Sequence, residues 1–338
     1  MATLGRGRRT RTRGAATTAA LLVTAVVAAW TAGCSSHHPG GDERGRPRPS
    51  AHSTAATPTP SSPPTRTSSG SVLAVKIDNV PAARPQRGLD SADVVYVEQV
   101  EGGLSRLMAV YATRLPDVIG PVRSARESDL ELLGQFDRPT LAFSGAQGKL
   151  LPLIDDAPLR PEPPGRVSGA YFRGSDHLAP HNLYLRPSRL LPSAPGPGAL
   201  TTGFRYGAAP EGGQPRTTRT VRYPAARVTF TWSADRHRWL VTQDGTPTVT
   251  AAGRRLAPAT VVVQYVKIRR SGYHDVLGNY TPYTETVGSG KAEVLRDGRS
   301  YDVRWERATA AAGTTFTARD GSPVNFAQGQ VWVVLAKA

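Results

Sequence analysis

A sharp change in composition near residue 70 limits where this chain can fold. Of the 36 residues between positions 35 and 70, 24 are Pro, Ser, Thr or Gly, and apolar side chains are nearly absent. Such a segment cannot bury enough apolar surface to fold, so we expect residues 34–70 to form a flexible tether. A core is therefore confined to residues 71–338, where apolar side chains become frequent at Val72.

The start of the chain has the pattern of an export signal. Five arginines before residue 14 precede an uncharged stretch from Ala15 to Trp30, which is shorter than the roughly 20 residues that a spanning helix needs. The sequence Thr31-Ala-Gly-Cys34 follows. It resembles a lipobox, although Leu usually stands where Thr31 is. We therefore expect residues 1–33 to be a lipoprotein signal peptide.

Cys34 is the only cysteine, so an intramolecular disulfide is excluded. Lipidation of Cys34 would hold the protein on the extracytoplasmic face of a bacterial cell membrane, provided that several acyl chains are attached. The alternative is an ordinary secretory cleavage with an incidental cysteine. The sequence thus predicts the membrane as a partner, reached through a lipid on Cys34.

The formal net charge of +16 admits two explanations. Of the 42 basic residues five are Lys and 37 are Arg, which is typical of coding bias in a GC-rich bacterium. The alternative is attraction to an anionic surface or polymer. Nucleic acid is not an expected partner, because the export signal places the protein outside the cytoplasm.

The first folded part, residues 71–200, predicts a mixed α/β domain. Strands rich in Val and Tyr are expected at residues 72–78, 92–100 and 106–113, with a short one at 118–122. Ser124-x-x-Glu127 then has the form of a capping box that opens a helix to about Phe136. A strand at 139–144 and a helical stretch to about Ile154 follow, and this alternation is typical of α/β folds.

The second folded part follows a linker at residues 201–220 and is expected to be a smaller, antiparallel β-rich domain over residues 221–338. Its strongest strand signal is the apolar run at residues 261–268, and Asp297-Gly298 is a hairpin-turn dipeptide. The predicted fold class is therefore α+β, with a mixed α/β domain before a β-rich one.

The stretch Gly120–Glu127 is the main candidate for a binding site. It carries two arginines beside an expected helix start, where unpaired N–H groups favour an anion. Arg side chains also grip carboxylate or phosphate with two hydrogen bonds. The alternative is that these arginines form structural ion pairs with nearby acids such as Asp78 and Glu101. The candidate ligand-binding residues are Arg84, Arg87, Arg123, Ser124, Arg126, Asn182 and Tyr184.

A weaker hypothesis gives the same region a catalytic role. Glu98 or Glu101 with His181 would supply acid–base chemistry, and Arg123 would stabilise charge. The sequence contains neither Gly-x-Ser-x-Gly nor His-Glu-x-x-His, and Cys34 is committed to the anchor. Pro180 argues against a metal site built from His177 and His181, because a proline between them prevents one helix face from carrying both. We expect neither a metal nor a cofactor.

Several of these segments together resemble a known family, the YerB-like bacterial lipoproteins (domain of unknown function 3048, N- and C-terminal parts). The resemblance implies an envelope location and a two-part layout, without an established activity. One departure is that a His is expected after the strand at 140–144, where this chain has Phe143-Ser-Gly-Ala146. The matching segments are 83–90, 92–96, 101–103, 120–126, 180–184, 232–239, 261–266, 288–294 and 329–332.

Taken together, the sequence predicts a lipid-anchored envelope protein that binds an anionic ligand through its first domain. An anionic wall polymer or an envelope protein is the expected partner besides the membrane. The alternatives are an envelope hydrolase or transferase, and a protein-binding scaffold that uses the β-rich domain as its contact surface.

Overall fold

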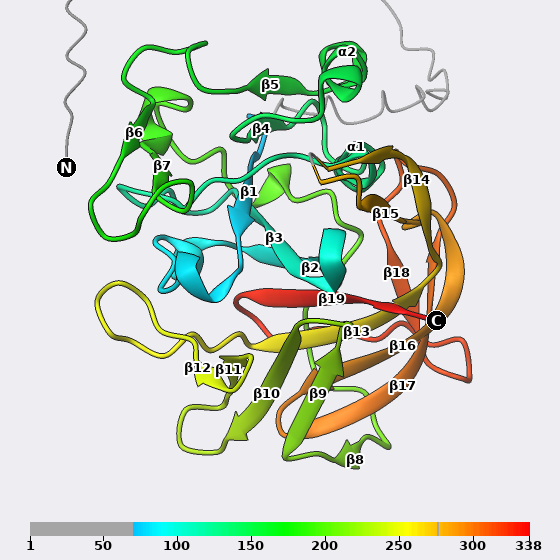
Figure 1. Cartoon of the computed structure of the whole chain (residues 1–338). Coiled ribbons are helices and arrows are strands. Elements are labelled where there is room, and N and C mark those ends of the chain that lie inside the picture. The colour runs from blue at the N-terminus through cyan, green and yellow to red at the C-terminus, as the bar shows by residue number, and fades with distance from the viewer. Residues whose placement is uncertain (1–69, 276) are drawn as a thin grey trace, which may run out of the picture. The chain divides into compact units, whose positions relative to one another are not determined.

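The apolar segments of both parts of the chain build one large sheet. The computed structural model describes residues 70–275 and 277–338 of the chain. Figure 1 shows this sheet running through the described part of the molecule. In order across the sheet the strands are β18 (Thr315–Thr317), β17 (Arg299–Arg307), β16 (Gly288–Arg296), β13 (Thr260–Val266), β19 (Val331–Lys337), β2 (Val94–Gln99), β3 (Ser105–Tyr111), β1 (Leu73–Asp78), β4 (Thr140–Ala142) and β5 (Arg160–Glu162), with β8 (Gln214–Pro215) paired to β17.

Strand β19 joins the two parts. It runs parallel to β13 on one side and to β2 on the other. Its side chains alternate between the two faces of the sheet, as the period of a strand requires: Val333 packs into one core and Trp332 into the other. Because both faces are covered, nearly the whole strand is apolar and buried. Residues 71–200 and 221–338 therefore share a sheet.

A second sheet covers one face of the first. Its strands are β12 (Thr246–Pro247), β11 (Arg238–Gln243), β10 (Arg227–Ser233) and β9 (Thr218–Arg222). The ring of Phe230 meets that of Trp332 edge-on at 5.9 Å, a favoured aromatic geometry. The other face is covered in part by α1 (Glu127–Leu133), which buries Leu132 and Leu133 in the core that contains Val333.

A separate hairpin lies beside α1 and forms hydrogen bonds with it. Strands β14 (Ile268–His274) and β15 (Tyr280–Thr284) form a two-stranded sheet beside the helix (Figure 1). The Glu131 carboxylate on α1 accepts hydrogen bonds from the Tyr283 hydroxyl and from the Thr286 N–H. Another two-stranded sheet comprises β6 (Tyr171–Arg173) and β7 (Leu183–Leu185).

The predicted mixed α/β domain is wrong, because strands rather than helices make up most of the regular structure of the described residues. Only two α-helices occur among them, α1 with seven residues and α2 (Leu151–Asp156) with six. Such short helices cover only part of one face of the sheet, and strands β9 to β12 of the C-terminal part cover the other face. The expected strand at 118–122 forms only isolated bridges. The β-rich part also departs from its prediction, since β13 pairs in parallel with β19.

No helix within residues 70–275 and 277–338 is long and apolar enough to cross a membrane. The predicted signal peptide, the lipidation site Cys34 and the tether lie outside the described residues.

Candidate functional site

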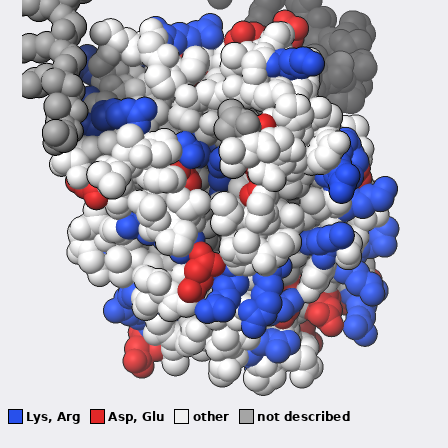
Figure 2. Space-filling view, viewed as in Figure 1, with Lys and Arg blue, Asp and Glu red and all other residues white. Residues whose placement is uncertain are grey.

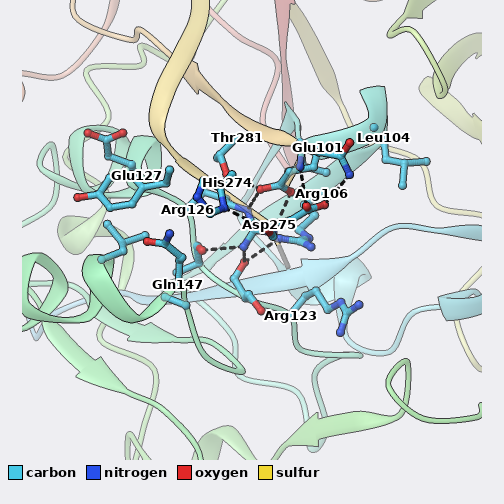
Figure 3. A pocket seen from close by; sticks show the side chains of 18 of the residues that line it. Glu101, Leu104, Arg106, Arg123, Arg126, Glu127, Gln147, His274, Asp275 and Thr281 are labelled. Atoms are coloured by element: carbon cyan, nitrogen blue, oxygen red, sulfur yellow. Dashed lines mark hydrogen bonds and ion pairs between the residues drawn. The ribbon is translucent and has the colours of Figure 1, made fainter. Parts of the chain in front are cut away.

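A cleft of about 610 Å³ opens beside the Gly120–Glu127 stretch, between the β2–β3 turn and the β14–β15 hairpin. Three arginines line it, Arg106 from β3 and Arg123 and Arg126 from the Gly120–Glu127 stretch, and we call it the arginine cleft (Figure 3). Its volume lies within the range of small-molecule sites. The sequence placed two of these arginines at the candidate site, and the structure adds Arg106 to them.

Arg126 is held by a carboxylate. Its Nε and Nη2 donate to the two oxygens of Glu101 at 2.6 and 2.8 Å, and the Thr281 hydroxyl donates to the same carboxylate at 2.6 Å. Burial alone would raise the pKa of Glu101, but the hydrogen bonds and charge of Arg126 outweigh it, so the pKa is lowered. Glu101 is therefore ionised at neutral pH, and it compensates the charge of Arg126.

Arg123 shares its carboxylate with a histidine. The Arg123 Nε lies 3.1 Å from Oδ2 of Asp78, and Nδ1 of His181 lies 2.8 Å from the same oxygen. Asp78 is buried at the end of β1, and a single oxygen of its carboxylate contacts both Arg123 and His181. His181 thus reaches the Gly120–Glu127 stretch through Asp78, although it is not among the residues that line the arginine cleft.

Arg106, in contrast, forms no ion pair within the described part of the chain. Its Nη1 donates to the Ser124 carbonyl oxygen at 3.2 Å, and no carboxylate of the described residues lies within ion-pair distance of its guanidinium. Burial, and then repulsion by Arg126, lower the pKa of Arg106 to about 10, although the more distant charges of Glu101 and Asp78 oppose this shift. The group still carries its proton at neutral pH, but at a cost in free energy. An anion in the cleft would reduce that cost.

A buried cluster of charges fixes the position of Arg126. The ammonium of Lys76 lies 2.6 Å from Oδ1 of Asp129 and 3.0 Å from Oε1 of Glu98, and all three side chains are buried. The other oxygen of Asp129 accepts the Arg126 N–H at 2.7 Å. Burial and the charge of Asp129 raise the pKa of Glu98, against the opposing effect of Lys76. Glu98 is therefore part of a structural cluster and does not line the cleft.

The helix start differs from its prediction. The N-cap residue of α1 is Arg126 rather than Ser124, and Asp129 takes the N–H that the sequence assigned to an external anion. A charged protein side chain thus already occupies the position at the helix start. A ligand in this region would therefore contact the arginine side chains rather than the backbone N–H groups of the helix start.

The other predicted ligand-binding residues lie apart from the cleft. Arg84 pairs with Asp244 of the β11–β12 turn at 2.8 Å. Arg87 pairs with Asp176 and stands 5.3 Å from the centre of the Tyr184 ring. Asn182 spans a turn, since its side chain donates to the Gly174 carbonyl oxygen at 3.1 Å. These contacts hold loops together.

Sequence reasoning missed two groups of residues. Lys76 and Asp129 were not singled out, although a lysine inside the otherwise apolar segment of β1 signals a buried charge that needs partners. Arg106, on the strand expected at residues 106–113, was not among the candidate ligand-binding residues. Within the described residues no group of three His, Cys, Asp or Glu side chains is placed to hold a metal ion.

Comparison with known proteins gives the family. Two models match, the N-terminal domain of the "Protein of unknown function (DUF3048)" over residues 56–199 and its C-terminal domain over residues 219–333. The protein named "Putative lipoprotein YerB" of Bacillus subtilis (strain 168) is 24% identical over 269 residues, which are 77% of this chain and 80% of YerB. That name agrees with the lipoprotein signal read from the sequence.

A crystal structure of the YerB protein from Bacillus subtilis has a similar fold. The TM-score is 0.66 at 19% identity, and the match covers 79% of this chain and 91% of the crystallised chain. The resemblance read from the sequence is thereby confirmed. The chain belongs to the YerB-like lipoprotein family of unknown function and carries its N- and C-terminal domains in order.

Proposed function

We propose that this lipoprotein is anchored on the extracytoplasmic face of the membrane and binds one anionic group of an envelope ligand in the arginine cleft. The observation that supports this is the guanidinium of Arg106, which forms no ion pair among the described residues and faces the cleft beside Arg123 and Arg126. A carboxylate or phosphate there would receive two parallel hydrogen bonds from an Arg fork.

The rest of the lining narrows the class of ligand. Asp78, Glu101, Glu127 and Asp275 also face the cleft and would repel a second or third negative charge. Apolar side chains form another part of the wall, namely Val80, Val100, Leu104, Ala146 and Leu150. The cleft therefore suits a ligand with one anionic group next to an apolar portion.

The test uses the full chain in detergent and inorganic phosphate as the probe, with acetate in a parallel series. A ligand that binds only the folded state raises the unfolding temperature by mass action. We expect phosphate to raise it in the wild type, and Arg106→Gln to lose most of that effect. Arg106→Lys, which keeps the charge without the fork, should lie in between.

Arg189→Gln is the matched control, because Arg189 is an exposed arginine that does not line the cleft. It removes the same charge and should respond to phosphate like the wild type. An equal response in wild type and Arg106→Gln would contradict the proposal.

A second proposal is an envelope hydrolase or transferase with His181 as the base. The hydrogen bond that Nδ1 of His181 donates to the Asp78 carboxylate favours it, since a carboxylate in that position orients an imidazole for proton transfer. The test is mass spectrometry of purified wall material after incubation with the full chain. Products that His181→Gln releases equally well would remove this option.

A further inference from the structure

A second hollow, of about 890 Å³, lies on the other side of the β14–β15 hairpin. Four cationic side chains line it, and the lining contains no Asp or Glu, so we call it the basic groove. The cationic residues are Arg222 of β9, Arg269 and Arg270 of β14, and Lys337 of β19. Figure 2 shows Lys and Arg side chains gathered on the face that carries this hairpin and the C-terminal end of the chain.

These four charges are mostly free of protein partners. All four residues are exposed. Arg269 pairs with Glu285 at 2.9 Å, but no carboxylate of the described residues lies within ion-pair distance of Arg222, Arg270 or Lys337. The groove therefore concentrates positive charge in a concave surface, which raises the local potential for an anion.

Aromatic rings hold two of the guanidinium groups. The Arg269 guanidinium stands 3.9 Å from the centre of the Tyr283 ring, and that of Arg270 stands 4.8 Å from the centre of the Tyr280 ring. Such stacking restricts a long side chain before any ligand arrives, so less conformational entropy is lost on binding. The arginines of β14 are thus better prepared for an anion than ordinary surface arginines.

We propose that the basic groove binds a linear polyanion whose charges are phosphate diesters. Several cations from three different strands in one concavity match several anionic groups of one chain. A flat bilayer surface cannot enter a concave site, which argues against lipid headgroups. A tetrahedral phosphate accepts hydrogen bonds from several directions, as Arg222 and Arg270 on separate strands require, whereas a carboxylate accepts them near one plane.

This site is distinct from the arginine cleft in both charge and ligand. The two share Gly102, Asn279 and Thr281 in their linings, so they are neighbours. None of the cations of one lines the other. Loss of Arg106 should therefore leave polymer binding intact, which separates a failure of this proposal from a failure of the proposed function.

The experiment measures fluorescence anisotropy of an end-labelled synthetic poly(glycerol phosphate) with the full chain in detergent. We expect Arg222→Gln/Arg270→Gln to weaken binding about tenfold, since the loss of each exposed charge pair should weaken it about threefold. The control Arg189→Gln/Arg236→Gln removes the same charge from two exposed arginines outside both hollows and should weaken it less than about twofold.

Three results would overturn the proposal. One is an equal loss in the two double variants, because net charge alone would then explain binding. Another is tighter binding to poly-glutamate than to the phosphate polymer. The third is binding to vesicles of anionic phospholipid without binding to the polymer.

Discussion

The arginine cleft and the basic groove are neighbours that differ in the burial and pairing of their positive charges. In the cleft, Arg123 and Arg126 are partly buried and each meets a carboxylate. In the groove, Arg222, Arg270 and Lys337 are exposed and have no carboxylate within ion-pair distance among the described residues. Burial requires compensation of a charge, and exposure does not. The number of arginines in a hollow is therefore a poor measure of its attraction for anions.

The difference also separates the ligands. Of the three arginines in the cleft, Arg106 alone forms no ion pair among the described residues, so one anionic group of a partly apolar ligand is the best match. In the groove, the charges lie in water and attract several groups of a polymer, an attraction that salt screens strongly. The predictions below test this contrast, in order of decreasing effect.

The largest effect is expected in the cluster beneath the cleft. Lys76→Met leaves Glu98 and Asp129 buried without their cation, which should cost about 3–5 kcal/mol of unfolding free energy. Because Asp129 also holds the Arg126 N–H, phosphate binding in the cleft should weaken, whereas polymer binding in the groove should not. Urea unfolding and the two binding assays measure these effects.

The pH dependence of this variant has a definite sign. A carboxyl group whose pKa is raised by folding, as for Glu98, stabilises the protein below its ordinary pKa of 4.5 and loses that contribution as the pH rises through the raised value. Without Lys76 the pKa rises further. The variant should therefore be less destabilised at about pH 5 than at about pH 8. Lys149→Met, at an exposed lysine, is the control, and an equal loss at both pH values would contradict the assignment.

Much of this arrangement follows from local sequence, and the rest does not. Segments rich in Val and Tyr form strands close to where they were expected, for example β2 and β13. Asp297-Gly298 joins β16 to β17 with both residues at positive φ, as the dipeptide favours. These features depend on a few neighbouring residues, which a single sequence contains.

The pairing of strands depends on distant residues. Val333 of β19 lies opposite Tyr96 of β2, and this pairing is what places the two parts in one sheet. Local periodicity gives the type of an element but not the surface that covers it, which is why the α/β interpretation failed. The site shows the same division. A cleft lies beside the stretch that the sequence singled out, but the pairing of Arg126 with Glu101 and the basic groove both required three-dimensional neighbours.

The next largest effect is expected when Arg126 loses its carboxylate, which would leave it unpaired like the arginines of the basic groove. Glu101→Gln removes the carboxylate of Arg126 and should cost about 1–3 kcal/mol at neutral pH, while the freed arginine binds phosphate more tightly. Folding lowers the pKa of Glu101, so its contribution is present above the ordinary value of 4.5 and disappears as the pH falls through the lowered one. Wild type and variant should thus converge in acid. Weaker phosphate binding by the variant would contradict this account.

Binding in the basic groove should depend more strongly on salt concentration than binding in the arginine cleft. Between about 50 and about 300 mM salt the Debye length falls to roughly half, so polymer binding in the exposed groove should weaken about tenfold. Phosphate binding beside the partly buried Arg106 should weaken much less. Titrations with sodium chloride in both assays measure the ratio, and equal salt dependence would remove the distinction between the sites.

The smallest effect concerns the ring beneath Arg270. Tyr280→Leu removes the aromatic face under the guanidinium but no charge, and a cation–π contact at an exposed site is worth about 0.5–1 kcal/mol. Polymer affinity should therefore fall about two- to fivefold. Tyr280→Phe keeps the ring and should bind like the wild type. If both variants lost affinity equally, the hydroxyl rather than the stacking would matter. If neither did, stacking on Tyr280 would contribute nothing measurable, and the groove would attract the polymer through charge alone.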